Sequence, residues 1–337
     1  MKILVTGGLG FIGSNFILYL LKNHPHLKIT NIDAEFLGSN RKNLQDLKNN
    51  KNYEYVKGNI TDSKLIEKLV SKNDAVINFA AESHVDRSIL DSKPFLESNI
   101  MGVYTLLDAI RKKKTKTRFV QISTDEVFGS LKTGYAKEKD VFRPSNPYSA
   151  SKASAELIAE SYVKTYDIDV IITRCTNNFG PRQFPEKLIP KTIIRSQKNM
   201  KIPIYGNGKN KRDWLFVDDH CDAIMKVLFK GKSGESYNIS SSNELTNIQL
   251  IEKILDMLNK PRDLIYFVED RPGHDLRYGL DSSKIRKKMA WKPKRKFEDD
   301  LWDTISWYLQ NDSWWKELVT SEMLHPTPWK KYRKKDK

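Results

Sequence analysis

The chain has 337 residues, 39% of them hydrophobic and 10% aromatic, a globular composition that excludes a disordered chain. Its net charge of +16 is spread along the sequence without a nucleic-acid motif, so we expect no nucleic-acid partner and an anionic substrate instead. No stretch approaches the roughly 18 apolar residues of a membrane helix, and no signal peptide precedes the first strand, so we expect a cytoplasmic protein without a membrane partner.

The first half of the chain alternates predicted strands with predicted helices. Apolar runs predict strands at Ile3–Val5, Ile29–Ile32, Tyr53–Val56, Ala75–Phe79, Phe119–Ile122 and Val170–Thr173. Amphipathic stretches between them predict helices at Ser14–Lys22, Lys64–Val70 and Asn99–Lys112. This alternation indicates an α/β fold of the Rossmann type, in which helices cover both faces of a doubly wound parallel sheet.

The pattern loosens after residue 177, where several prolines interrupt it. We therefore expect a first domain over residues 1–176 and a smaller C-terminal α/β domain over residues 177–320, which covers the carboxyl edge of the sheet. The run Ser236–Ile239 predicts a late strand that returns to the first sheet, so residues 213–240 should contain return segments of the first domain. Residues 321–337 should form a basic tail.

A glycine-rich loop follows the first predicted strand in the stretch ILVTGGLGFIG. Gly8, Gly10 and Gly13 have the G-x-G-x-x-G spacing, which permits a tight turn, a close approach to a pyrophosphate and close packing of helix on strand. The diphosphate would lie at the N-terminus of the following helix. Asp33 ends the second strand twenty residues after Gly13, where its carboxylate can bind a ribose diol and would repel a 2′-phosphate. The loop therefore predicts NAD rather than NADP as cofactor.

Two adjacent acidic residues follow the fifth predicted strand, in the stretch STDEVFG at residues 123–129. Thr124, Asp125 and Glu126 place a hydroxyl and two carboxylates side by side, although repulsion and desolvation oppose such a pair in a buried place. By itself this stretch favours a solvated turn or a helix N-terminus, where acidic residues are stabilised.

A tyrosine and a lysine stand four residues apart in the stretch PYSASK. On a helix, Tyr148 and Lys152 would share one face, with their Cβ atoms roughly 5–6 Å apart. A nearby ammonium favours the phenolate form of a tyrosine, and an oxidised nicotinamide would act in the same direction. Tyr148 could then take the proton of a sugar hydroxyl while Thr124 hydrogen-bonds the same oxygen. Alone, the pair could equally be two solvated helix residues.

With these parts in order, the sequence resembles the extended short-chain dehydrogenase/reductase superfamily and, within it, the nucleotide-sugar 4,6-dehydratases, especially those acting on dTDP-glucose. The resemblance is carried by the stretches TGGLGFIGSN, AAESHVDRSI, ISTDEVFG, NPYSASKASAE, NNFGPRQFPEKLIP, IPIYGNGKNKRDWLFVDDH and DRPGHDLRY, which extend up to about Asn311. The sequence departs from the family pattern at several points: DAEFLGSN follows the second strand, Asn59 replaces a common Asp, and Phe128 and Phe179 stand where Tyr is common.

The resemblance implies that Asp125 is a general acid and Glu126 a general base, acting beside Thr124, Tyr148 and Lys152. Oxidation of C4 of glucose would acidify the C5 proton, which Glu126 removes while Asp125 protonates the departing C6 hydroxyl. The implied activity is a hydro-lyase that makes dTDP-4-keto-6-deoxyglucose and water, for deoxysugar or rhamnose synthesis. Related 4-epimerases lack the adjacent Asp-Glu pair, which is the most discriminating feature of the sequence.

The resemblance also implies two sets of binding residues and an assembly. The expected NAD contacts are Gly7, Gly10, Phe11, Ile12, Gly13, Asp33, Asn59, Ile60, Phe79, Ala80, Ala81, Ser83, Ser98, Tyr148, Lys152 and Asn178. The expected contacts of the nucleotide-diphosphate sugar are Ser83, His84, Thr124, Asn177, Lys187, Leu188, Pro203, Ile204, Tyr205, Arg212, Asn247, Asp270, Arg271, His274 and Tyr278. A homodimer is expected on the helices at Asn99–Lys112 and Ser151–Lys164.

Other readings remain open at this point. The same reaction could take UDP-glucose or another nucleotide hexose, because the nucleotide base is recognised by pocket shape and a few backbone groups. C4 epimerisation of a nucleotide sugar and an NAD-binding regulator without catalysis are less favoured by the Asp-Glu pair. Cys175 and Cys221 show no metal-ligand spacing and no disulfide framework, so we expect two buried packing residues and no metal.

Overall fold

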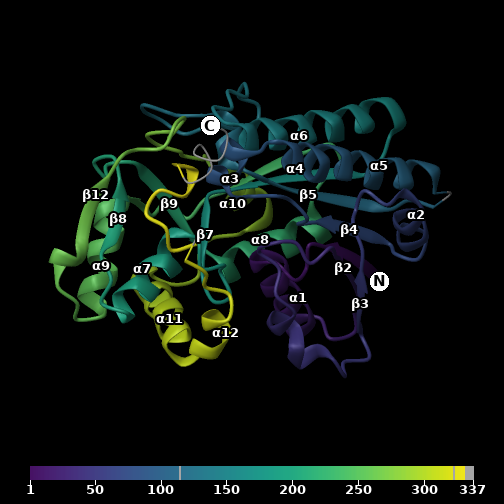
Figure 1. Ribbon diagram of the computed structural model, residues 1–337. Coiled ribbons are helices and arrows are strands. Elements are labelled where there is room, and N and C mark those ends of the chain that lie inside the picture. The colour runs from purple at the N-terminus through teal and green to yellow at the C-terminus, as the bar shows by residue number, and fades with distance from the viewer. Residues whose placement is uncertain (114, 322, 331–337) are drawn as a thin grey trace, which may run out of the picture.

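The computed structural model describes residues 1–113, 115–321 and 323–330, and its largest element is a parallel sheet (Figure 1). Over the described residues this sheet has seven strands in the order β10-β6-β5-β4-β1-β2-β3. Every neighbouring pair in it is parallel, which confirms the doubly wound α/β fold. Its strands are β1 (Lys2–Thr6), β2 (Lys28–Asp33), β3 (Tyr53–Lys57), β4 (Ala75–Asn78), β5 (Arg118–Thr124), β6 (Val170–Cys175) and β10 (Ser236–Ile239).

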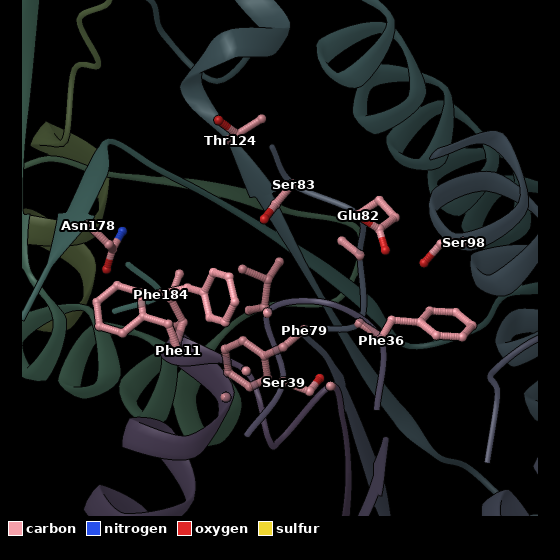
Figure 2. Close-up of a pocket in the computed structure, with 18 of the residues that line it drawn as sticks. Phe11, Phe36, Ser39, Phe79, Glu82, Ser83, Ser98, Thr124, Asn178 and Phe184 are labelled. Carbon is pink, nitrogen blue, oxygen red and sulfur yellow. The ribbon is translucent and has the colours of Figure 1, made fainter. Parts of the chain in front are cut away.

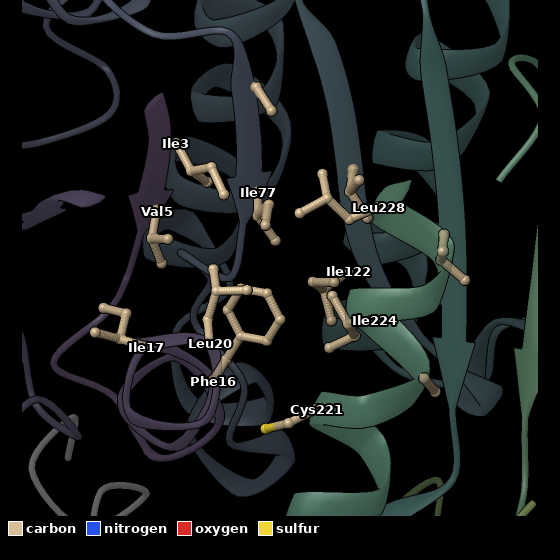
Figure 3. Packing of buried hydrophobic residues seen from close by; sticks show 14 of the residues in the cluster. Ile3, Val5, Phe16, Ile17, Leu20, Ile77, Ile122, Cys221, Ile224 and Leu228 are labelled. Carbon is tan, nitrogen blue, oxygen red and sulfur yellow. The ribbon is translucent and has the colours of Figure 1, made fainter. Parts of the chain in front are cut away.

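The central strands are apolar throughout because helices bury both of their faces. Ile3 and Val5 of β1 pack toward helices α1 (Phe11–Asn23) and α8 (Val217–Lys230), whereas Leu4 between them packs on the opposite face. Figure 3 shows the first of these layers, in which Phe16 and Leu20 of α1 lie close to Ile77 and to residues of α8. Cys221 belongs to this layer and Cys175 is also buried, as expected of packing residues.

The opposite face of the sheet is covered by α2 (Ser63–Ser71), α5 (Gly102–Lys112) and α6 (Pro147–Tyr166) (Figure 1). Helix α6 begins where Asn146 and Ser149 form a capping box and Pro147 occupies the first turn, so the sequence itself sets its start. Shorter helices α3 (Val85–Leu90) and α4 (Lys93–Leu96) precede α5. The expected helix at 99–112 begins as a π-helical segment, Glu97–Met101, and continues as α5.

The second half of the chain builds smaller sheets beside the carboxyl edge of the main one. Strands β7 (Asn177–Phe179), β9 (Lys211–Phe216) and β11 (Glu244–Thr246) form one sheet, and β8 (Ile202–Tyr205) pairs with β12 (Ile265–Val268). The side chains of this region pack into an apolar cluster that is separate from those of the main sheet. Its helices are α7 (Leu188–Gln197), α9 (Asn247–Met257), α11 (Phe297–Gln310) and α12 (Asp312–Lys316), while α10 (Ser283–Met289) packs against β10.

Strand β10 pairs in parallel with β6, which confirms the predicted late return to the first sheet. The expected return segment 213–240 is nevertheless divided: β9 belongs to the small three-stranded sheet, and α8 and β10 belong to the main sheet and its cover. The predicted fourth strand also ends one residue early, at Asn78, so that Phe79 lies in the loop beyond it.

The expected basic tail at 321–337 is only partly covered by the structure, since residues 331–337 lie outside the described part. Within that part, Leu324 and Trp329 are buried, so this stretch is packed onto the fold and the expectation of a tail is wrong for it. Among the described helices, none combines the length and the apolar character that crossing a membrane requires.

Candidate active site

A cavity of about 300 Å³ opens at the carboxyl edge of the main sheet (Figure 2). The loops after β1, β2, β4, β5 and β6 all contribute to its wall, as expected for ligand sites of doubly wound sheets. Figure 2 shows Thr124 and Ser83 at one side of this space, Asn178 beside Phe184, and Phe36 and Ser98 toward the other end. Every residue that we expected to contact NAD lines the cavity.

The glycine loop has the steric constraints of a phosphate-binding turn. Gly7 has a φ of +68°, and a Cβ atom there would lie 2.7 Å from the backbone of Ala80. A Cβ atom on Gly13 would lie 2.4 Å from the carbonyl oxygen of Gly7, so only glycine allows the helix to approach the strand this closely. Helix α1 starts directly after Gly10 with no side-chain cap, which leaves its first N–H groups for an anion.

Asp33 lies at the end of β2 and is buried in the cavity wall. Its carboxylate accepts hydrogen bonds from the backbone N–H of Leu9 at 2.9 Å and of Glu35 at 2.8 Å, and from the Ser39 hydroxyl at 2.8 Å. Burial raises the pKa of Asp33 above its usual range. These bonds orient the carboxylate beside the glycine loop, so the loop, the uncapped helix end and this acid together fit a dinucleotide.

Asp125 is a buried acid at the end of β5, where the 3-10 helix Asp125–Phe128 begins. The Thr124 hydroxyl donates to its Oδ1 at 3.0 Å, and its Oδ2 is buried without a hydrogen-bond partner among the described residues. Burial first, and the neighbouring Glu126 second, raise the pKa of Asp125 to about 8. The helix start was predicted correctly, but a solvated turn was wrong, because the carboxyl faces the cavity and stays protonated at neutral pH.

Glu126 is less buried than its neighbour and reaches the same cavity. Its backbone N–H donates to the Thr124 hydroxyl at 3.3 Å, and its Oε2 accepts a hydrogen bond from the Tyr278 hydroxyl at 3.3 Å. The Thr124 hydroxyl therefore contacts both acidic residues: it donates to the side chain of Asp125 and accepts from the backbone N–H of Glu126. The arrangement places a protonated acid and a second carboxyl next to each other on one wall.

Tyr148 and Lys152 lie on α6, and both side chains are buried in the wall of the cavity. The Lys152 ammonium donates to the carbonyl oxygen of Ile122 at 2.6 Å, and burial lowers its pKa to about 8. Burial, followed by the charge of Glu126, raises the pKa of Tyr148 well above its usual value. The expected lowering by Lys152 is therefore not present in the protein alone, because desolvation and an adjacent acid dominate.

The expected substrate contacts fall into two groups. Ser83, Thr124, Asn177 and Lys187 line the cavity, and the Lys187 ammonium donates to the carbonyl oxygen of Ser83 at 3.2 Å. The remaining expected contacts do not line it: His84, Leu188, Pro203, Ile204, Tyr205, Arg212, Asn247, Asp270, Arg271, His274 and Tyr278.

Some residues of this second group nevertheless contact residues of the cavity wall or lie next to those contacts. The Tyr278 hydroxyl donates to Glu126, and the Arg212 guanidinium lies over the Tyr278 ring, with its Cζ 4.3 Å from the ring centroid. Arg271 donates to Asp86 at 2.7 Å, beside Tyr205.

The side chain of Ile204 does not fit the role that we expected of it. It is 2% exposed and packs in the apolar core between β8 and α9, so that as a side chain it cannot contact a ligand. His84 is also enclosed: its Nε2 lies 3.8 Å from a Glu186 carboxylate oxygen, and burial lowers its pKa to about 4. His84 is therefore neutral at physiological pH and lies outside the cavity lining, next to Ser83 in the chain.

Sequence reasoning missed an ion-paired group at the cavity rim. The Arg87 guanidinium donates to Glu186 at 2.8 Å and lies 3.6 Å from Glu82, and all three residues line the cavity. Arg87 and Glu186 occur within the family-like stretches, but no local pattern pairs positions 99 residues apart. Ser39, which holds Asp33, carried no signal beyond its place after the second strand.

A parallel sheet that brings a dinucleotide loop to a tyrosine–lysine helix is the arrangement of short-chain dehydrogenases/reductases, and this chain has it in the extended form with a second, smaller region. Comparison with known proteins agrees: residues 4–304 match the family model described as GDP-mannose 4,6 dehydratase. The chain belongs to the nucleotide-sugar 4,6-dehydratases of the extended short-chain dehydrogenase/reductase family.

Three relatives define the similarity. The low-salt glycan biosynthesis protein Agl12 of Haloferax volcanii is 48% identical over 93% of this chain and 100% of its own length. A dTDP-glucose 4,6-dehydratase of Actinoplanes sp. is 45% identical over 94% of this chain and 100% of its own. The crystal structure of DesIV, a dTDP-glucose 4,6-dehydratase from Streptomyces venezuelae with NAD bound, is 42% identical, with a TM-score of 0.93 over 95% of this chain and 100% of that chain.

Proposed function

We propose that the protein is a dTDP-glucose 4,6-dehydratase that binds NAD in the cavity and converts dTDP-glucose to dTDP-4-keto-6-deoxyglucose and water. The observation that carries this proposal is the buried Asp125, whose pKa of about 8 keeps a proton beside Glu126 at the site where Tyr148 and Thr124 also meet. Residues 1–176 with the returning segments would bind the cofactor, and residues 177–320 the sugar nucleotide. The product would enter deoxysugar or rhamnose synthesis in the cytoplasm.

The side chains divide the reaction between C4, C5 and C6 of the hexose. When bound, NAD supplies a hydride acceptor at C4, a hydride donor at C6 and, in its oxidised form, a positive charge. Tyr148 accepts the proton of the C4 hydroxyl, and Thr124 hydrogen-bonds the same oxygen. Lys152, anchored to Ile122, keeps an ammonium on the tyrosine-bearing face of α6. The positive charge counteracts the burial that raises the pKa of Tyr148.

Elimination of water needs an acid and a base that hold different protonation states. Glu126 removes the C5 proton, which the C4 ketone has made acidic, and Asp125 gives its proton to the C6 hydroxyl, which leaves as water. Burial supports this assignment of roles, because it raises the pKa of Asp125 to about 8 and so favours the protonated form that an acid needs. A proton returned to C5 completes the 4-keto-6-deoxy product without net oxidation.

The nucleotide diphosphate would lie across the second group of residues. Arg271 and Arg212 carry guanidinium groups, which bind two phosphate oxygens at once, and Lys187 adds a charge at the cavity wall. Burial lowers the pKa of Lys187, and an anion beside it would raise that pKa again.

The test of the proposed function is incubation of the purified protein with dTDP-glucose and, separately, with UDP-glucose. Formation of the 4-keto product, followed by its absorbance in alkali, is expected with dTDP-glucose. Because Agl12 is named for glycan biosynthesis and not for a nucleotide, another nucleotide hexose is the second candidate, and turnover of UDP-glucose alone would favour it. A C4 epimer as product, or bound NADH with no 4-keto product from any sugar nucleotide, would refute a dehydratase.

A homodimer through helices α5 and α6 is part of the proposal. Large apolar side chains are exposed there: Met101, just before α5, is 51% exposed, Tyr104 44%, Leu157 57% and Tyr166 48%. A second copy would cover this apolar surface. Light scattering of the protein as it elutes from a size-exclusion column should give twice the chain mass. The Leu157→Glu variant should give the monomer mass. A wild-type monomer would contradict this part.

A further inference from the structure

The C-terminal segment 323–330, called the C-terminal strap below, is held to the region that we assign to the sugar nucleotide. It follows α12 and includes the short helix Pro328–Lys330, while Leu324 and Trp329 are 8% and 5% exposed. Two cations of α7 hold its backbone: the Lys191 ammonium donates to the carbonyl oxygen of His325 at 2.9 Å, and the Arg195 guanidinium donates to that of Leu324. These contacts fix the segment far more firmly than a charged tail.

The side chain of Trp329 ends against Tyr205 of β8. Their rings meet edge to face, with centroids 4.5 Å apart and an interplanar angle of 82°. The Tyr205 ring also lies beside that of His274, at a centroid distance of 6.3 Å. Tyr205 is therefore enclosed between a residue of the strap and a residue of the loop at 270–274, and rotation of its ring would require Trp329 to move.

Tyr205 passes this constraint to a buried ion pair. Its hydroxyl donates to Asp86 Oδ2 at 3.2 Å, and Asp86 Oδ1 accepts a hydrogen bond from the Arg271 guanidinium at 2.7 Å. Asp86 is 2% exposed, and among the described residues Arg271 Nε is buried without a hydrogen-bond partner. A buried guanidinium with an unsatisfied N–H is the donor that a phosphate oxygen would satisfy.

We propose that Trp329 is a positioning residue, through which the C-terminal strap orients Tyr205, Asp86 and Arg271 to bind the diphosphate of the substrate. The inference rests on the proposed function, which assigns Arg271 to the nucleotide diphosphate. Without Trp329, the tyrosine ring gains freedom, its bond to Asp86 weakens and Arg271 is no longer held in one orientation. Affinity for the nucleotide then falls, whereas Asp125, Glu126 and the glycine loop after β1 belong to other elements than this chain of contacts and should keep their geometry.

The experiment compares Trp329→Ala with the wild type and with Trp302→Ala, a matched control that removes a 48% exposed tryptophan of α11. Calorimetry gives the Kd of dTDP and of NAD, and steady-state kinetics give KM and kcat for dTDP-glucose. For Trp329→Ala we expect the Kd of dTDP and the KM to rise about tenfold, with kcat within twofold and the Kd of NAD unchanged. Trp329→Phe should recover most of the affinity, and Trp302→Ala should behave as wild type.

A second variant acts on the same chain of contacts without opening a cavity. Tyr205→Phe keeps the ring beside Trp329 but loses the hydroxyl that bonds Asp86, so it should raise the Kd of dTDP severalfold even if Trp329→Ala does not fold. An unchanged Kd of dTDP in these variants overturns the proposal, as does an equal loss of NAD affinity. Wild-type protein that binds neither dTDP nor UDP also overturns it. Wild-type protein that binds dTDP but forms no 4-keto product refutes the dehydratase function alone.

Discussion

Replacement of Asp125 by asparagine should remove activity and at the same time change how stability depends on pH. Asparagine has nearly the same shape and can still accept the hydrogen bond that Thr124 donates to Oδ1 at 3.0 Å. It has no proton to give to a leaving hydroxyl, so we expect kcat to fall by about 10²–10⁴-fold. Product formation from dTDP-glucose measures this loss.

The pH dependence follows from the raised pKa of Asp125, about 8 in the folded protein against an ordinary value of 3.8. Between these values the native state binds a proton that the unfolded state has released, so the free energy of unfolding falls as pH rises. The slope is about 1.4 kcal/mol per pH unit, or about 3 kcal/mol between pH 5 and pH 7. The contribution is fully present below the unfolded pKa and is lost as pH approaches 8. Asp125→Asn lacks this slope.

Urea unfolding of the protein without nucleotides at pH 5, 6 and 7 measures the difference. The control is Asp46→Asn, which changes an exposed carboxylate of the same kind. Wild type and control should show the same pH dependence, and between pH 5 and pH 7 their free energy of unfolding should fall by about 3 kcal/mol relative to that of Asp125→Asn. Parallel stability curves for wild type and Asp125→Asn would refute a protonated Asp125, and with it the assignment of this residue as the acid.

Three further substitutions test the other parts of the site. Glu126→Gln should abolish elimination but allow C4 oxidation, seen as bound NADH by its absorbance; turnover at the wild-type rate would contradict a role as base. Gly13→Ala places a methyl group 2.4 Å from the Gly7 carbonyl oxygen and should abolish NAD binding in calorimetry, whereas unchanged affinity would disprove the phosphate loop. Asp33→Asn should weaken NAD at least tenfold and narrow its preference over NADP; clear preference of the wild type for NADP would overturn the cofactor choice.

Local sequence was enough to predict the dinucleotide loop, the main strands and the helix that carries Tyr148 and Lys152. These features depend on the backbone over a few neighbouring residues: glycine spacing, apolar runs and the distance of four residues along a helix. Tyr148 and Lys152 line the same cavity as the glycine loop. The cavity lies at the edge of the sheet where the carboxyl ends of the parallel strands meet. The sequence also predicted that Ser236–Ile239 forms a strand of the main sheet, because a short apolar run is enough for a strand in a buried sheet.

Protonation states and long-range pairs were decided by tertiary structure. The letters of STDEVFG are compatible with a solvated turn, and only burial beside Glu126 raises the pKa of Asp125 to about 8. Burial likewise reversed the expected direction of the Tyr148 pKa. The partners of Arg87 and Trp329 lie 99 and 124 positions away along the chain, at Glu186 and Tyr205. Desolvation and distant contact arise only when the chain has closed on itself, so no local pattern encodes them.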